Sequence, residues 1–185
     1  MKVIKFLLIV FITLTSLVKA DSVNEISQKL KKEGYLIFIR HAYAPGGGDP
    51  NTFNLDDCST QRNLSNSGRI QAEKIGSFFK NNFIPIDLVI SSEWCRCKET
   101  ASISFKNFIT KNFLNSFYSK KFASNKDQQM KELKDYIKNW DGKKNLVFIT
   151  HYVVIAEVLN YAPSSGEIVI SDKNLKVIET INIGY

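Results

Sequence analysis

Two histidines follow apolar segments of the same design. Residues 36–41 read Leu-Ile-Phe-Ile-Arg-His and residues 146–151 read Leu-Val-Phe-Ile-Thr-His, and the chain has no other histidine. Runs of four β-favouring apolar residues are typical of strands buried on both faces of a parallel sheet. Ligand sites in such folds lie at the carboxyl edge of the sheet, so we expect His41 and His151 to face one site. The alternative is that one or both are ordinary loop histidines.

The chemistry that suits this arrangement is phosphoryl transfer. A neutral imidazole held beside a phosphorus atom can attack it and form a covalent intermediate. A phosphate group carries about −1.5 to −2 charges at neutral pH, and arginine binds its oxygens through a planar fork of N–H donors. The sequence offers Arg40, Arg62 and Arg96 as donors, and a protonated His151 would add a fourth.

Other kinds of catalytic site fit the sequence less well. There is no Gly-x-Ser-x-Gly nucleophile elbow, and the glycine run at residues 46–48 lacks the Gly-Lys-Ser/Thr of a nucleotide-binding loop. Two histidines are too few for a His–Asp metal cluster, and the cysteines form no Cys-x-x-Cys zinc pair. We therefore expect no metal and no cofactor.

The elements that must position these residues alternate between helix and strand. The pattern predicts helices at Val23–Glu33, after the N-cap Ser65, and at Trp94–Phe105, Asp127–Trp140 and Val153–Tyr161. Besides the two histidine segments, it predicts strands at Asp87–Ser91, Glu167–Ser171 and Leu175–Ile183. We assign no element to Phe108–Phe122. This order indicates an α/β fold with three layers: a mostly parallel central sheet flanked by helices, with a C-terminal β-hairpin at the sheet edge.

A long polar loop, Ala42–Gln61, follows the first histidine strand. It contains three consecutive glycines, Asp49-Pro50 and the acidic pair Asp56 and Asp57. Loops of this length in a compact domain are usually functional or disordered. We expect this loop to form the flexible rim of a site.

The first twenty residues have the pattern of a secretory signal peptide. Lys2 and Lys5 precede the apolar stretch Phe6–Ile12, and Val18 and Ala20 occupy the small-residue positions before a cleavage point. The apolar stretch is shorter than the ~20 residues of a membrane span, although an uncleaved anchor is the alternative. We expect a signal peptide at residues 1–20, a single domain at residues 21–185, a periplasmic or secreted location, and no stable membrane insertion after cleavage.

The charge of the chain indicates little about macromolecular partners. Cleavage after residue 20 would lower the net charge from +7 to about +4, because the leader holds three lysines and no acid. The remaining lysines are scattered along the chain, which favours a solvated surface over nucleic-acid binding. We expect a small-molecule ligand and no nucleic acid, and the sequence leaves the oligomeric state open.

The three cysteines suit an oxidising compartment. Cys95 and Cys97 are too close in sequence to pair without strain. We therefore expect one disulfide, from Cys58 to either Cys95 or Cys97, and one free thiol.

Four segments in order resemble the motifs of the histidine phosphatase superfamily. The motifs of that family are Arg-His-Gly, Leu-[Ser/Thr]-x-x-Gly-x-x-Gln-Ala, Ser-x-x-x-Arg-x-x-x-Thr-Ala and [Ser/Thr]-His-Gly. In the same order, the segments of this chain that resemble them are residues 40–41, 64–72, 92–101 and 150–151. The resemblance implies that His41 is the nucleophile that forms a phosphohistidine. It also implies that Arg40, Arg96 and His151 bind the phosphate, and Arg62 matches a position that is basic in some branches.

The chain departs from the family pattern at three places. Ala42 and Tyr152 replace the glycines that follow the two histidines, and the Tyr152 ring must point away from the pocket or form one of its walls. Many members also place a Glu or Asp after the arginine helix as a general acid, whereas Leu114–Phe117 contains no carboxylate. The acids that we expect to reach the sheet edge instead are Glu93, Asp57 and Glu167.

The resemblance implies a metal-independent phosphatase that acts on a small phosphomonoester through a phosphohistidine. Within the superfamily the chain is similar to the secreted branch that includes the lipopolysaccharide-core heptose phosphatases, which implies an envelope sugar phosphate as substrate. The missing acid and Tyr152 motivate one alternative, a catalytically silent phosphate- or glycan-binding module on the same fold.

Overall fold

The computed structural model describes residues 24–32 and 34–185. The predicted signal peptide at residues 1–20 lies outside the described residues. Residues 24–32 are helical and belong to the first predicted helix. Within the part of the chain that is described, no helix is both long enough and apolar enough to cross a membrane.

A six-stranded sheet with the order β3-β2-β4-β1-β5-β6 organises the fold. Its strands are β1 (Leu36–Arg40), β2 (Ile86–Ser91), β3 (Ile109–Thr110), β4 (Asn145–Thr150), β5 (Ile168–Ser171) and β6 (Val177–Ile181). The first four strands run parallel to one another, whereas β5 is antiparallel to both β1 and β6. The predicted α/β fold, with a mostly parallel sheet and a C-terminal hairpin at its edge, is confirmed.

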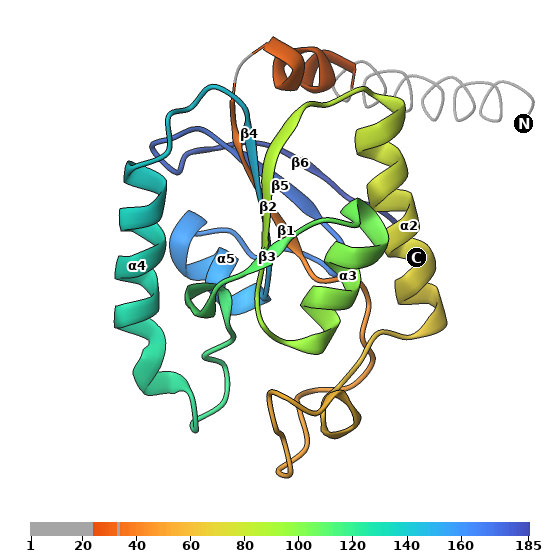
Figure 1. Ribbon diagram of the computed structural model, residues 1–185, viewed down its shortest axis with the longest axis vertical. Helices are drawn as coiled ribbons and strands as arrows, with labels where there is room; N and C mark the ends of the chain where they lie inside the picture. The colour runs from red at the N-terminus through yellow and green to blue at the C-terminus, as the bar shows by residue number, and fades with distance from the viewer. Residues whose placement is uncertain (1–23, 33) are drawn as a thin grey trace, which may run out of the picture.

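Helices cover both faces of this sheet, because side chains along a strand point alternately to opposite faces. On β1, Leu36 and Phe38 enter one core together with α4 (Lys126–Lys138) and α5 (Tyr152–Leu159). Ile37 and Ile39 enter the other core with residues 24–32, α2 (Asn66–Asn81) and α3 (Cys95–Phe105). Figure 1 shows α4 and α5 to the left of the sheet and α2 and α3 to its right. The apolar runs are thus buried on both faces, as predicted.

The pairing of β1 with β4 determines where the histidines lie. The two strands are parallel neighbours, and Arg40 is in register with Thr150. The backbone N–H of His41 donates to the carbonyl oxygen of Thr150 at 2.9 Å, which extends this register by one residue. His41 and His151 therefore leave the carboxyl edge of the sheet side by side.

The segment between α3 and α4, for which the sequence predicted no element, contributes an edge strand. Ile109 of β3 pairs with Ile90 of β2, and the short 3-10 helix η2 (Asn112–Leu114) follows. Leu114 is fully buried in the core beneath α4. A strand of two residues has no alternation to detect, which explains why periodicity does not identify it.

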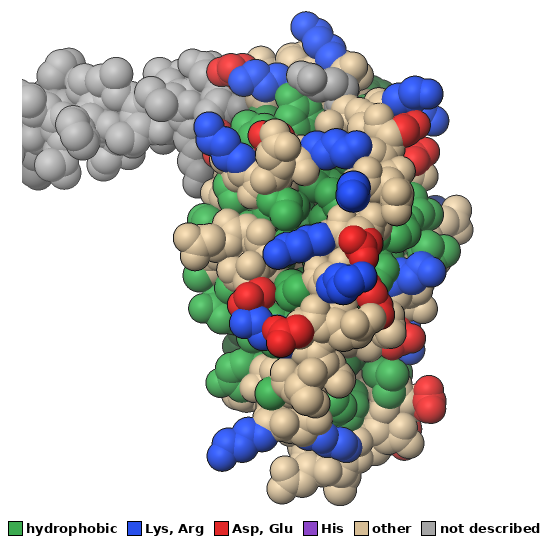
Figure 2. Space-filling view, turned by 90° about the vertical axis from the view of Figure 1, so that its left-hand side faces the viewer, with side chains coloured by type: hydrophobic (Ala, Val, Ile, Leu, Met, Phe, Trp, Pro, Cys, Tyr) green, Lys and Arg blue, Asp and Glu red, His purple; other side chains and the backbone are tan. Residues whose placement is uncertain are grey.

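The outer face formed by α4 carries charges of both signs. Figure 2 shows lysine and arginine side chains interspersed with acidic ones on this side of the molecule. Two ion pairs of 2.9 Å lie here, Lys126 with Glu157 and Lys131 with Asp135. Such exposed pairs add little to stability but make a well-solvated surface.

A disulfide ties the loop after β1 to the start of α3. It joins Cys58 to Cys95, one of the two pairings that the sequence left open, and leaves Cys97 as a buried free thiol. The 3-10 helix η1 (Cys58–Thr60) and hydrogen bonds from the Gln61 amide to the carbonyls of Asn54 and Leu55 hold the same loop. The loop does rim the cavity described below, but its second half is fixed in place.

Removal of this disulfide should destabilise the protein substantially. The bridged cysteines are 37 positions apart, and the loss of a cross-link over a loop of that length costs about 4 kcal/mol. We expect the double substitution Cys58→Ala/Cys95→Ala to lower the free energy of unfolding by this amount in guanidinium titrations. Unchanged stability would show that the bridge does not form in the protein.

Candidate active site

The two histidine rings meet in a buried pocket at the carboxyl edge of the sheet. Their centroids are 5.5 Å apart in an edge-to-face arrangement, and the residues are only 2% and 3% exposed. Each ring follows directly from a strand whose backbone is fixed by the sheet. Their separation is therefore set by the pairing of β1 with β4 rather than by loop conformation.

The ring of His41 is held in one tautomer. Its Nδ1 lies 2.8 Å from the carbonyl oxygen of Ala42, which can only accept, so Nδ1 carries the proton. The other ring nitrogen, Nε2, accepts a hydrogen bond of 3.1 Å from Nε of Arg96. Nε2 therefore carries a lone pair, which is the form that a nucleophilic imidazole needs.

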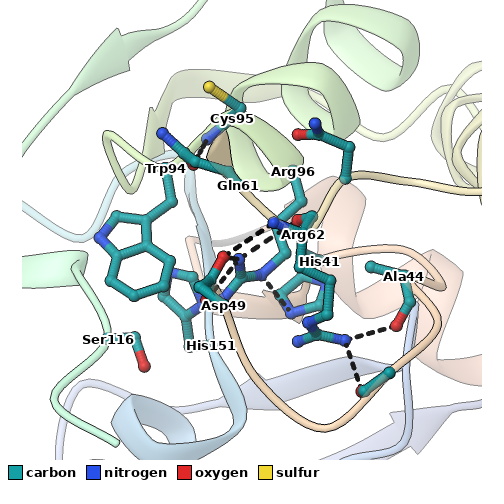
Figure 3. A network of polar contacts seen from close by, with 12 residues as sticks. His41, Ala44, Asp49, Gln61, Arg62, Trp94, Cys95, Arg96, Ser116 and His151 are labelled. Atoms are coloured by element: carbon teal, nitrogen blue, oxygen red, sulfur yellow. Dashed lines mark hydrogen bonds and ion pairs between the residues drawn. The ribbon is translucent and has the colours of Figure 1, made fainter. Parts of the chain in front are cut away.

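Arg96, the second residue of α3, links the two histidines. Its Nη2 is 3.5 Å from Nδ1 of His151, and its guanidinium lies 4.6 Å from the centroid of the Trp94 ring. Figure 3 shows this guanidinium between His41, His151 and Asp49. The sequence placed Arg96 at the same sheet edge, and the structure brings it into direct contact with the first histidine.

A short chain of hydrogen bonds orients His151. Nε2 of His151 is 2.9 Å from Oγ of Ser92, and that hydroxyl donates to Oδ1 of Asn115 at 2.8 Å. Because the hydroxyl proton is used on Asn115, the Ser92 oxygen accepts from His151. Nε2 of His151 is thus protonated, and Nδ1 presents its lone pair toward Arg96.

Both histidines are neutral in this structure. Burial lowers the pKa of His41 well below its ordinary value near 6.5, and the positive charge of Arg96 lowers it further. Burial also lowers the pKa of His151 well below its ordinary value. The charge of Arg96 and the neighbouring His41 lower it further. The fourth donor that a protonated His151 would add is therefore not present at neutral pH without a ligand, although a bound phosphate dianion would favour the protonated ring by opposite charge.

These pKa shifts predict an acid-sensitive fold. Below pH 6.5 the unfolded chain takes up protons on its histidines while the native chain does not. The free energy of unfolding therefore decreases as the pH is lowered. With two such groups, the free energy of unfolding can decrease by at most about 2.7 kcal/mol for each pH unit. We expect neither histidine to titrate between pH 7.5 and 6 in an NMR experiment on the native protein, while urea-induced unfolding becomes easier over pH 6.5 to 5.5. Titration of either ring near pH 6.5 would contradict this.

A cavity of about 630 Å³ opens above the histidines. All five residues that the sequence predicted to bind phosphate or act on it line this cavity: Arg40, His41, Arg62, Arg96 and His151. Nε of Arg40 and Nε of Arg62 are buried donors with no acceptor among the described residues. Buried N–H groups are normally hydrogen-bonded, so these two indicate a site for an anionic ligand.

Two of these arginines are anchored by backbone carbonyls. Nη1 of Arg40 donates to the carbonyl of Pro163 at 2.9 Å, and Nη1 of Arg62 donates to the carbonyls of Ala44 and Gly46. Burial is the main reason that the pKa of each is lowered, followed by the charge of Arg96. Because arginine is a very strong base, both side chains remain cationic at neutral pH.

Asp49, from the loop after β1, also lines the cavity, and the sequence did not single it out. Its Oδ1 and Oδ2 accept from Nη1 of Arg96 at 2.9 and 3.2 Å, and Oδ1 accepts from the backbone N–H of Arg62. Among residues 24–32 and 34–185, it is the one acidic residue that lines this cavity. The carboxylate thus occupies part of the guanidinium fork that a phosphate would need.

The three acids predicted from the sequence lie elsewhere, because each is engaged by a local partner. Oε2 of Glu93 accepts from the Asn115 amide at 2.6 Å, and Asp57 caps η1 by accepting from Ser59. Glu167 is buried and accepts from the hydroxyl of Tyr161 and the backbone N–H of Ser164. The structure does not bring Glu93, Asp57 or Glu167 to the cavity wall.

Uncharged residues of the segments 64–72 and 92–101 hold the backbone after His41. A Cβ on Gly68 would lie 2.0 Å from the carbonyl oxygen of Tyr43, so only glycine lets α2 approach this loop. Oε1 of Gln71 accepts from the Tyr43 N–H, and the Thr100 hydroxyl accepts from the Ala42 N–H. These three contacts fix the chain that carries the His41 ring.

Aromatic side chains form one wall of the cavity. The rings of Phe53, Trp94 and Phe122 contact one another at centroid distances between 4.5 and 5.7 Å, and Trp94 also contacts His151. Tyr152, which replaces a family glycine, lines the cavity with its ring 5.7 Å from the Arg40 guanidinium. Of the two orientations expected for this tyrosine, the structure shows the one in which it forms a wall.

Cys97 does not make a thiolate site with the adjacent histidine. Its Sγ is 3.5 Å from Nε2 of His151, a contact that would suit a Cys–His pair. Burial, however, raises the pKa of Cys97 to about 12, so the side chain is a thiol at neutral pH. Cys97 therefore lacks the thiolate that a sulfur nucleophile needs.

A protein-family model matches part of the chain. The model of the histidine phosphatase superfamily (branch 1) matches residues 36–147, which is more than half of the chain. The matched region contains His41 and Arg96, whereas His151 lies just beyond it. No curated protein matches the chain.

Several solved structures have a similar fold. One is the protein histidine phosphatase SixA complexed with tungstate, 13% identical, with a TM-score of 0.56 over 80% of this chain and 96% of that chain. A SixA from Agrobacterium tumefaciens is 16% identical, with a TM-score of 0.56 over 81% of this chain and 98% of that chain. A phosphoglycerate mutase from Thermus thermophilus is 14% identical, with a TM-score of 0.54 over 80% of this chain and 98% of that chain. At these identities the likeness shows a shared fold, and it covers nearly all of each relative.

Proposed function

Because this chain belongs to the histidine phosphatase superfamily, we propose that it is a phosphomonoesterase that acts through a phosphohistidine on a small phosphorylated substrate. The observation that carries the proposal is the state of His41: a buried, neutral imidazole with its Nε2 lone pair beside a guanidinium. Three arginines around the same cavity supply the positive charge that a phosphate requires. Tungstate, bound by the SixA structure, is likewise a tetrahedral oxyanion, which supports this ligand class.

In the first step, the phosphate oxygens take the guanidinium donors of Arg40, Arg62 and Arg96. Nε2 of His41 forms a bond to phosphorus while the bond from phosphorus to the ester oxygen breaks. The Ala42 carbonyl stabilises the positive ring by accepting from Nδ1. Neutral His151 donates through Nε2 to Ser92, and a bound dianion favours the uptake of a proton from water at Nδ1, which then donates to the phosphate.

The departing oxygen needs a proton, and Asp49 is the residue placed to supply it. When a phosphate takes over Arg96, the Asp49 side chain is released from that guanidinium beside the bound ester, and we assign to it the proton that the leaving oxygen takes. A proton given to the leaving group contributes about 10²–10⁴ in rate. Asp49 takes the role for which the sequence suggested Glu93, Asp57 or Glu167.

In the second step, water attacks the phosphohistidine. The N–P bond breaks, inorganic phosphate leaves, and His41 returns with its lone pair. Asp49, now a carboxylate, accepts the proton of the attacking water, so atoms and charges balance over the cycle. The negative charge on the phosphoryl oxygens is met by arginines, so we expect turnover to survive chelation.

A secreted or periplasmic location and an envelope sugar phosphate remain our proposals for setting and substrate. The signal-peptide pattern of residues 1–20 supports the first, and the disulfide suits an oxidising compartment. Resemblance to the secreted heptose-phosphatase branch motivates the second. The aromatic wall suits the apolar face of a sugar ring.

An assay of the purified protein on p-nitrophenyl phosphate, with and without EDTA, tests the proposed function. We expect turnover with a kcat near the ordinary range of enzymes, about 1–10³ s⁻¹, that EDTA does not lower and that inorganic phosphate inhibits competitively. Loss of activity on chelation would overturn metal-independent catalysis. Tight binding of vanadate without any turnover would instead favour the catalytically silent binding module.

A further inference from the structure

The cavity is much larger than a phosphate group. Its volume of about 630 Å³ has room for some twenty water-sized groups, and the phosphate-binding residues gather at its base. The remainder must accommodate the part of the substrate that leaves. The residues that line this outer part therefore indicate the chemistry of the leaving group.

The outer part is lined by the segment Ser116–Phe122, which includes two adjacent lysines. Lys120 and Lys121 both line the cavity, and both are exposed. Neither forms an ion pair with any carboxylate in the described part of the chain. The single acid of the cavity, Asp49, is already bound to Arg96. The two lysines thus place uncompensated positive charge at the mouth.

An aromatic path separates these lysines from the histidines. The Trp94 ring is 5.0 Å from the His151 ring, and the Phe122 ring is 5.7 Å from the Trp94 ring. The Lys121 ammonium lies 5.4 Å from the Phe122 centroid. Two aromatic rings therefore stand between the base of the cavity and the lysine pair, a spacing that suits one ring-sized organic group.

We propose that Lys120 and Lys121 form a second anion subsite, and that the natural substrate is a phosphomonoester whose ring-sized leaving group carries another anionic group. This inference rests on the proposed function for the position of the first phosphate. The ring packs against Trp94 and Phe122, and its carboxylate or second phosphate pairs with the lysines. The phosphate that is transferred binds to Arg40, Arg62 and Arg96. The second anion binds to the lysines.

A matched pair of non-hydrolysable ligands tests the subsite without relying on turnover. 4-(Phosphonomethyl)benzoate carries a carboxylate, and the corresponding benzamide carries a neutral group of the same size. We expect calorimetry to give about a fivefold tighter Kd for the benzoate, the scale of two partly exposed ion pairs, and the preference to shrink at high salt. Equal Kd values would overturn the proposal.

Substitutions locate the preference. In Lys120→Gln/Lys121→Gln we expect the ratio of the two Kd values to fall to about one. Lys143→Gln/Lys144→Gln removes the same charge from another adjacent, exposed lysine pair that does not line the cavity, and it should retain the ratio. A preference that survives the first substitution, or disappears in the second, would contradict the subsite.

The two proposals fail separately in this design. If the wild type binds the benzoate more tightly but does not hydrolyse p-nitrophenyl phosphate, the subsite stands and the phosphatase does not. If it hydrolyses p-nitrophenyl phosphate but binds both ligands equally, the phosphatase stands and the subsite does not. Binding of neither phosphonate would remove the subsite together with the anion site on which it rests.

Discussion

Substitution of His41 by alanine should reduce kcat for p-nitrophenyl phosphate by at least about 10⁴-fold, because it removes the proposed nucleophile. Phosphate binding should persist, since the guanidinium groups of Arg40, Arg62 and Arg96 remain in the cavity. The expected pattern is thus a large loss in kcat with a modest change in the inhibition constant of inorganic phosphate. Turnover that survived the substitution would exclude His41 as nucleophile.

The phosphohistidine can be assigned without ambiguity because the chain has two histidines. Rapid quenching in base during turnover, followed by peptide mapping, should find phosphate on the peptide that contains His41. In His151→Gln the same peptide should be labelled, at a lower rate, because the change removes a donor rather than the nucleophile. Label on the peptide of His151 would reverse the two roles.

The parts of the site that the sequence predicted are those fixed by regular elements. His41 and His151 end two strands whose apolar runs identify them, and parallel neighbours must deliver both to one edge. Arg96 follows β2 by a short turn into α3, so its approach to that edge also follows from chain order. In each case the backbone position is set by hydrogen-bonded secondary structure, which periodicity reveals.

The parts that the sequence did not predict lie in irregular segments. Asp49 reaches Arg96 only because the loop after β1 folds back, tied by the disulfide and by the amide of Gln61. No repeating pattern reports such a path. The one available signal was an acid beside a glycine run in a long loop that follows a predicted catalytic residue.

The three acids suggested from the sequence do not line the cavity, and the sequence did not reveal this either. Glu93 is close in sequence to Arg96, yet the amide of Asn115 holds its carboxylate. Glu167 is buried against Tyr161, and Asp57 is used as a helix cap. Nearness in sequence did not decide their roles, because each found a local hydrogen-bond partner.

Substitution of Asp49 by asparagine should separate binding from catalysis. The carboxylate, itself 11% exposed, is bound to Nη1 of Arg96, and an incoming phosphate must displace it. Removal of this internal competitor, and of its repulsion toward an anion, should tighten the Kd of inorganic phosphate by about tenfold, since a buried pair is worth more than a surface one. Calorimetry measures this directly.

The same change should impair turnover, and the size of the loss should depend on the leaving group. With an alkyl phosphate, whose alkoxide needs a proton to depart, we expect kcat to fall by about 10²–10⁴-fold in Asp49→Asn. With p-nitrophenyl phosphate, whose phenolate leaves unaided, the loss should be much smaller. Asp56→Asn, which removes an exposed acid of the same loop outside the cavity, should change neither phosphate affinity nor rate. Equal losses on both substrates would show that Asp49 only positions Arg96, and weaker phosphate binding would show that it does not compete with the substrate for that guanidinium.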